Sequence, residues 1–128
     1  MRKLLTALVA IFGFVCAVIG LAHIVLGPRS IPGSVPVNAT MDSEDRFYAT
    51  LFIGFGVAIA WASRDLDRRE KVFGALLLVF FLGGIARIVS AAMVGLPSGL
   101  FIFLGSLELI LPPLFWFWHR ATRISPAG

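Results

Sequence analysis

Residues Val72–Gly95 read VFGALLLVFFLGGIARIVSAAMVG, a stretch in which Arg87 is the only charged residue. An α-helix rises about 1.5 Å per residue, so about 20 consecutive apolar residues cross the hydrocarbon core of a bilayer. The stretch therefore predicts a transmembrane helix. Arg87 then needs an explanation, because a charge near the centre of such a helix costs about 2.5 to 3.5 kcal/mol on insertion scales.

Similar apolar stretches fill most of the remaining chain, and they predict spans at about 4–27, 45–63, 72–95 and 100–118. Hydrophobic residues make up 59% of the 128 residues, charged residues 14%, and the mean hydropathy is +0.94. Such a chain has too little polar surface to cover a soluble globule. We therefore expect an all-α protein, an integral membrane four-helix bundle with antiparallel up-down topology, that forms a single domain over residues 1–128.

The basic residues predict the orientation of this bundle. Eight of the eleven Lys and Arg residues lie before the first span, between the second and third, or after the fourth. The positive-inside rule then places both the N and C termini in the cytoplasm. Topology and contact with anionic lipid also account for the pI of about 10.2, so no nucleic-acid partner is expected. The eight residues are Arg2, Lys3, Arg64, Arg68, Arg69, Lys71, Arg120 and Arg123.

Arg87 and Glu108 are expected to meet inside the membrane. Arg87 lies eight residues before Gly95, and Glu108 lies eight residues after Leu100. At 1.5 Å per residue, each is about 12 Å from the outer end of its helix. Because the two helices are adjacent and antiparallel, the guanidinium and the carboxylate should form a pair.

His23 and Arg46 lie nearer the outer surface and are expected to join this pair. His23 is about 6 Å from the end of the first span, and the long side chain of Arg46 reaches down from the lip of the second. A cation in the first turn opposes the helix dipole, so Arg46 should have a partner elsewhere. The resulting ligand-binding or charge cluster comprises His23, Asp45, Arg46, Arg87 and Glu108.

The segment Pro28–Thr40, with three prolines, predicts a non-helical outer loop that is either a lid over the bundle or a simple connector. After it, the acidic run Asp42–Asp45 is expected to open the second helix and to supply its N-cap. In the fourth span, Pro112 and Pro113 free the carbonyls of Glu108 and Leu109. This break indicates either a packing kink or a cavity at the level of Glu108.

Small residues at helical spacing predict which faces pack. One stripe in the first span and one ladder in the second permit close backbone approach. The stripe comprises Gly13, Cys16, Gly20, His23 and Gly27, and the ladder comprises Arg46, Thr50, Gly54, Ala58 and Ala62.

No metal site or cofactor is expected. His23 and Glu108 lack further ligands, and Arg87 would repel a cation. The lone Cys16 excludes an intramolecular disulfide and a thiolate cluster. Aromatic residues at the inner end predict an interfacial belt that includes a surface-exposed His119. The belt comprises Trp61, Phe115, Trp116, Phe117, Trp118 and His119.

Several short motifs resemble those of a bacterial family of small four-helix membrane proteins classed as a domain of unknown function and broadly DoxX-like in layout. The resemblance covers nearly the whole chain and implies a multi-pass protein of the bacterial inner (plasma) membrane. It suggests His23, Arg46, Arg87 and Glu108 as the pattern residues, but implies no activity. The motifs are GLAH at 20–23, DRFYA at 45–49, GGIAR at 83–87, GLP at 95–97 and the glutamate at 108.

Three function classes follow from the charged cluster. The first is a non-enzymatic module that binds an amphiphilic or quinone-like ligand, or serves as an accessory subunit of a larger membrane complex. The second is a proton-coupled small-molecule transporter that works as a homodimer, with Glu108 and His23 exchanging a proton. The third is an intramembrane enzyme with Glu108 or His23 as acid or base and Arg87 as the stabiliser of negative charge. The first is favoured over the transporter and the enzyme, and the lipid bilayer is the partner common to all three.

Overall fold

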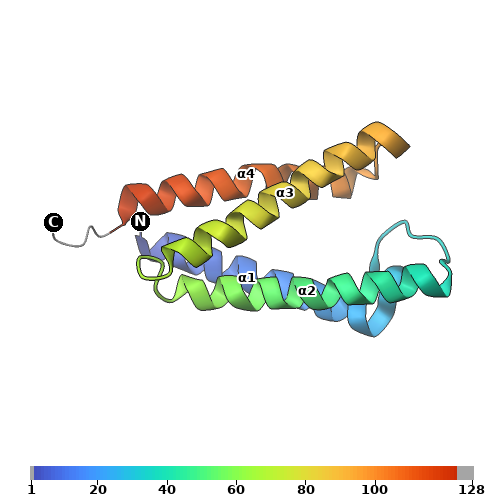
Figure 1. Ribbon diagram of the computed structural model, residues 1–128, viewed down its shortest axis with the longest axis horizontal. Coiled ribbons are helices and arrows are strands. Elements are labelled where there is room, and N and C mark those ends of the chain that lie inside the picture. The colour runs from blue at the N-terminus through green and yellow to red at the C-terminus, as the bar shows by residue number, and fades with distance from the viewer. Residues whose placement is uncertain (1, 124–128) are drawn as a thin grey trace. The chain divides into compact units, whose positions relative to one another are not determined.

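Helices account for nearly all of the chain in the computed structural model, which describes residues 2–123. Helix α1 is Arg2–Leu26, followed by the 3-10 helix η1, Gly27–Ser30. Helices α2, α3 and α4 are Ala39–Ser63, Glu70–Val94 and Gly99–Thr122 (Figure 1). The described residues contain no strand, which confirms the all-α prediction.

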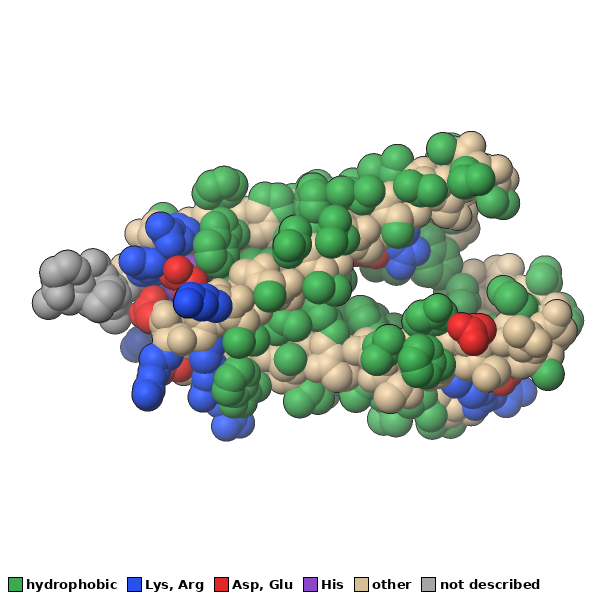
Figure 2. All heavy atoms as spheres, in the orientation of Figure 1, with side chains coloured by type: hydrophobic (Ala, Val, Ile, Leu, Met, Phe, Trp, Pro, Cys, Tyr) green, Lys and Arg blue, Asp and Glu red, His purple; other side chains and the backbone are tan. Residues whose placement is uncertain are grey.

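All four α-helices are long and apolar enough to cross a membrane, which indicates a multi-pass membrane protein. Large hydrophobic side chains remain exposed along the helices, for example Phe14, Val25 and Phe103. Figure 2 shows hydrophobic side chains along the visible lengths of the helices, with most Lys, Arg, Asp and Glu side chains near helix ends and a further basic and acidic patch away from them. Such a surface suits contact with lipid, because hydrocarbon does not penalise an exposed apolar side chain.

The chain divides into two compact units, each described by itself below. One comprises Ala7–Arg64, and the other comprises Met1–Thr6 with Asp65–Gly128. Each unit contains a pair of antiparallel helices, α1 with α2 and α3 with α4 (Figure 1).

Close backbone contact joins α1 to α2. A Cβ added to Gly13 would lie 2.5 Å from the carbonyl oxygen of Gly56, and one added to Gly20 would lie 2.8 Å from that of Ala49. The small-residue stripe predicted on the first helix therefore faces α2. The ladder predicted on α2 is wrong, because a Cβ on Gly54 would meet open space. The face of α2 against α1 contains Ala49, Ile53, Gly56 and Ala60 instead.

Helix α2 begins earlier than expected. Asn38 is its N-cap, and the Asn38 side chain accepts a hydrogen bond of 2.9 Å from the backbone N–H of Met41. The N-cap predicted within Asp42–Asp45 is therefore wrong, although Asp42 does lie in the first turn. The amide of Asn38 is a sequence signal for this N-cap, although the prolines before it favour a longer loop.

Glycines also allow α3 and α4 to approach closely. A Cβ on Gly84 would lie 2.9 Å from the side chain of Leu109, and one on Gly105 would lie 3.2 Å from Cδ of Arg87. Helix α3 ends at Val94, and its C-cap is Gly95, whose φ of 115° is strained for residues with a side chain. The short connection that follows returns the chain into α4 and places Arg87 opposite Glu108.

Candidate functional site

The expected pair between Arg87 and Glu108 is present at the interface of α3 and α4. Nε of Arg87 donates to both carboxylate oxygens of Glu108, at 2.5 and 2.7 Å. The side chain of Glu108 is 10% exposed, whereas that of Arg87 is 45% exposed. The carboxylate is thus enclosed by protein, while the guanidinium reaches the surface of the unit.

Two neighbours hold the guanidinium in place. The aliphatic part of the Arg87 side chain packs over Gly105, where an added Cβ would lie 3.2 Å from Cδ of Arg87. The ring of Phe101 lies on the same helix, with its centroid 5.8 Å from Cζ of Arg87, within the range of a cation–π interaction. Helix α4 therefore supplies the counterion, the space and the aromatic face for one cation on α3.

The mode of pairing leaves hydrogen-bonding capacity unused. A guanidinium carries five N–H donors, and Glu108 engages only the one on Nε. Between residues 2 and 123, no partner accepts from the two terminal amino groups of Arg87. These two amino groups can therefore donate hydrogen bonds to a bound molecule.

A second pair joins α1 to α2. Nδ1 of His23 lies 3.1 and 3.0 Å from the two carboxylate oxygens of Asp45, and both side chains are 21% exposed. A carboxylate only accepts hydrogen bonds, so Nδ1 carries the proton and donates it. In the neutral imidazole this leaves Nε2 with a free lone pair, and no residue in the described chain occupies it.

Arg46 has a hydrogen-bond partner on another helix, as expected for a cation near the start of α2. Its Nε donates to Asp42 at 2.7 Å, and its Nη1 donates to the backbone carbonyl of Ile24. The last carbonyls of a helix have no intrahelical donor, and they form the negative end of the dipole. Arg46 therefore caps the C-terminal end of α1 from α2.

The predicted site residues thus form two groups in two separate units. Arg87 and Glu108 lie in the unit that contains α3 and α4, and His23, Asp45 and Arg46 lie in the unit Ala7–Arg64. Convergence of all five into one cluster stays a prediction.

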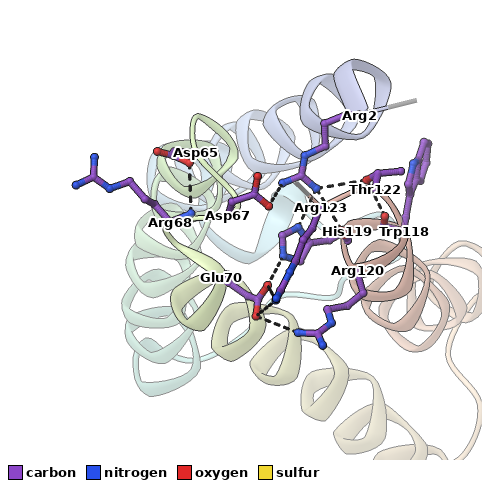
Figure 3. A network of polar contacts seen from close by, with 10 residues as sticks. All are labelled: Arg2, Asp65, Asp67, Arg68, Glu70, Trp118, His119, Arg120, Thr122 and Arg123. Atoms are coloured by element: carbon purple, nitrogen blue, oxygen red, sulfur yellow. Dashed lines mark hydrogen bonds and ion pairs between the residues drawn. The ribbon is translucent and has the colours of Figure 1, made fainter. Parts of the chain in front are cut away.

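A network around His119 was missed by sequence reasoning. Nε2 of His119 lies 2.8 Å from Glu70, and Nδ1 lies 2.9 Å from Nη1 of Arg2 (Figure 3). Glu70 also accepts from Arg120 at 3.1 Å and from Arg123 at 2.9 Å. The three helix ends that meet here all belong to the unit of Met1–Thr6 and Asp65–Gly128.

The partners of His119 determine its tautomer. Arginine has no acceptor, so Nδ1 accepts from Arg2 and the Nε2–H donates to Glu70. The His119 side chain is 0% exposed and its ring meets the ring of Phe73 edge-on, with the centroids 5.7 Å apart. The expectation of a surface-exposed His119 in the aromatic belt is therefore wrong, and Phe115 is buried as well.

A sequence signal for this network did exist. Glu70 is the single acid in the basic run Arg68–Lys71, and a histidine at the end of an apolar span has few polar neighbours other than such an acid. Topology is enough to explain a positive charge at Arg2, so the sequence does not reveal its role as a hydrogen-bond donor to His119.

The two prolines of α4 do not interrupt the helix, which continues from Gly99 to Thr122. They line an open apolar groove of about 470 Å³ together with side chains of α3, among them Leu77 and Phe81. Glu108 does not line this groove. Across residues 2–123, no three His, Cys, Asp or Glu side chains are grouped to hold a metal ion.

Comparison with known proteins gives a family without an assigned activity. Neither the curated proteins nor the solved structures include one with significant similarity to the chain. Residues 4–119 match DUF4345, described as a domain of unknown function. This range includes both charged pairs and nearly all of the four helices, so the chain belongs to the DUF4345 family.

Proposed function

We propose that this protein is a small multi-pass protein of the bacterial inner membrane that binds the polar head of an amphiphilic or quinone-like ligand at Arg87. The unoccupied terminal amino groups of Arg87 carry this proposal. Glu108 holds the guanidinium by its Nε side, so the two amino groups offer a pair of parallel donors to a single acceptor.

The charge of the pair limits the kind of ligand. Arg87 and Glu108 together are neutral, so an added full negative charge at this depth would itself be unpaired. A carbonyl oxygen, as in a quinone or an ester, accepts two N–H bonds without that cost. The Phe101 ring beside the guanidinium and the exposed apolar side chains of α3 and α4, Ile88 and Phe103 among them, suit the hydrophobic part of such a ligand.

Contacts at the other end of the same unit support the proposed orientation. Arg2 donates to Asp67 at 2.8 Å and to Thr122 at 3.4 Å. The start of α1, the connection before α3 and the end of α4 therefore lie together, as an up-down bundle with both termini in the cytoplasm requires. The basic residues of these segments favour the cytoplasmic side, and Arg87 then lies in the outer half of the bilayer.

A charge swap tests whether Arg87 binds a ligand or only joins two helices. Arg87→Glu combined with Glu108→Arg preserves the attraction but moves the free amino groups to α4. The wild type and the swap would be reconstituted in phosphatidylcholine nanodiscs and titrated with decylubiquinone, with bound quinone measured by native mass spectrometry.

We expect the swap to fold and to lose saturable quinone binding by about tenfold or more, since two hydrogen bonds to a charged donor are displaced. The matched control is Arg120→Gln, which removes a cation at the opposite end of α4 and should leave quinone binding unchanged. Equal binding by the swap and the wild type would refute the proposal. A wild type that binds no quinone but copurifies stoichiometrically with a membrane protein would instead favour the accessory-subunit role.

The His23–Asp45 pair favours a second candidate, a proton-coupled transporter that works as a homodimer. Asp45 orients the imidazole through Nδ1 and leaves Nε2 free to accept a proton. Proton uptake by liposomes containing the protein, followed with an entrapped pH-sensitive dye, tests this candidate. His23→Gln should abolish any flux above that of empty liposomes, whereas His119→Gln should not. Equal flux with and without the protein would exclude transport of protons.

A further inference from the structure

A cavity of about 570 Å³ lies beneath the outer loop of the unit Ala7–Arg64. The end of α1 and η1 contribute Leu26, Pro28 and Arg29 to its wall, the loop contributes 34–37, and α2 contributes Asp42 and Arg46. Its volume falls within the range of about 300 to 1,000 Å³ typical of small-molecule sites. The wall mixes apolar side chains with charged ones, which suits an amphiphile.

The charges in the wall favour an anion. Arg29 and Arg46 supply two positive charges, and Asp42 supplies one negative charge. Asp42 is already paired with Arg46 at 2.7 Å, so the positive charge of Arg29 is not neutralised by it. Arg29 is therefore the cation of the wall that is left to attract a negative charge.

Arg29 is positioned to use that charge. Its Nε donates to the carbonyl of Leu26 at 3.1 Å, which fixes the guanidinium at the end of α1. No group within residues 2–123 accepts from its terminal amino groups. A phosphate or carboxylate presents two oxygens at the spacing of these donors.

The opposite wall of the cavity is held rigidly. Gly27, with a φ of 68°, passes so close to the ion pair that a Cβ there would lie 2.7 Å from Nη2 of Arg46 and 2.9 Å from Asp42. Arg46 also binds the carbonyl of Ile24. In contrast, the loop has no helix or strand at residues 31–38, and Val35 is 71% exposed. One wall is thus preformed and the other is a loop that packs little against the helices.

We infer that this cavity binds the anionic head of an amphiphile, a phosphate monoester or a carboxylate, with Arg29 as the primary ligand. Leu26, Pro28 and the valines of the loop contact the apolar part next to the head. The head belongs either to a membrane lipid or to a soluble molecule, and both share the same chemistry. This site shares no residue with the proposed one at Arg87, so either can fail without the other.

Isothermal titration of the full chain in phosphatidylcholine nanodiscs tests the inference. The probes are butyl phosphate, inorganic phosphate and the neutral butanol, at constant ionic strength, and a parallel set of nanodiscs contains phosphatidic acid. We expect saturable binding of butyl phosphate, none of butanol, and competition by phosphatidic acid if a lipid is the source. No competition by phosphatidic acid, with butyl phosphate still bound, indicates a soluble ligand, whereas inorganic phosphate bound as tightly as butyl phosphate would contradict the apolar contacts and overturn the amphiphile.

Three variants decide the location. Arg29→Gln should weaken butyl phosphate binding about tenfold. Arg64→Gln removes an exposed cation at the other end of the unit and should leave the affinity unchanged. Val35→Asp introduces a negative charge into the loop wall and should abolish binding without altering the thermal unfolding midpoint. Unchanged affinity in Arg29→Gln or Val35→Asp, or equal losses in Arg29→Gln and Arg64→Gln, would overturn the inference.

Discussion

Arg2 and His119 are 117 positions apart in the sequence, yet Nη1 of Arg2 donates to Nδ1 of the buried His119 ring at 2.9 Å. The same guanidinium also donates to the carbonyl oxygen of His119 and to Asp67. One side chain in the first turn of α1 therefore links the end of α4 to the connection before α3. Arg2 is one of the basic residues that predict the orientation of the helices, and it is also part of the internal hydrogen-bond network of its unit.

Arg2→Gln should destabilise the protein by about 2 kcal/mol, because it leaves the buried Nδ1 of His119 without a donor. Lys3→Gln is the matched control. It removes a positive charge from the same end of α1, but the side chain of Lys3 is exposed. Unfolding would be followed by circular dichroism during titration with sodium dodecyl sulfate. Equal losses in the two variants would mean that only the charge at the N-terminus matters.

Arg87→Leu should cost about 3 kcal/mol, because it strands the carboxylate of Glu108, whose side chain is 10% exposed. The double variant Arg87→Leu with Glu108→Leu should recover most of that loss, since no unpaired charge remains. A double-mutant cycle of unfolding free energies measures the coupling between the two side chains. Strictly additive losses would contradict a direct pair.

Gly56→Ala should destabilise the α1–α2 pair by about 2 kcal/mol, because the added methyl would overlap the backbone of α1 at Gly13 and Ala17. Backbone atoms cannot move aside as the end of a flexible side chain does. Gly54→Ala is the control in the same helix, and a Cβ there meets open space. Thermal unfolding in detergent would compare the two, and a larger loss in Gly54→Ala would place the wrong face of α2 against α1.

Asn38→Ala should cost about 1 kcal/mol, the usual effect of removing an N-cap side chain that binds a backbone N–H. Ser98 occupies the N-cap of α4 without such a bond, so Ser98→Ala should change stability by only a few tenths of a kcal/mol. Hydrogen exchange of the first-turn amides in α2 and α4 would locate each effect. Protection lost equally at both helices would argue against a specific cap at Asn38.

Much of the architecture was accessible from sequence because it depends on properties that each segment carries by itself. Apolar stretches of span length predict the helices, and antiparallel counting from Gly95 and Leu100 predicts the contact between Arg87 and Glu108. The small residues of α1 likewise predict a packed face. These inferences need only helix geometry, which is the same in every protein.

The predictions that were wrong concern contacts between two segments of the chain. On α2, spacing of four selects Gly54, but the helix is rotated so that Gly56 meets α1. His119 was assigned to the surface because its sequence neighbours are aromatic and basic, whereas Glu70 and Arg2 bury it. The hydrophobic periodicity and the composition of a helix predict its packed face only to within one residue. They contain no information on which distant group supplies a hydrogen bond.

Four apolar helices, with an arginine and a glutamate at equal depth in two of them, can be predicted from the order of the amino acids, because hydrophobicity and the rise per residue are local quantities. How the hydrogen-bond donors are used depends instead on the packed fold. It engaged Arg87 through Nε alone, turned Arg46 into a cap for α1, and enclosed His119 between Glu70 and Arg2. Those outcomes depend on the rotation of one helix against its neighbour, which is set by packing over glycines and not by either helix alone.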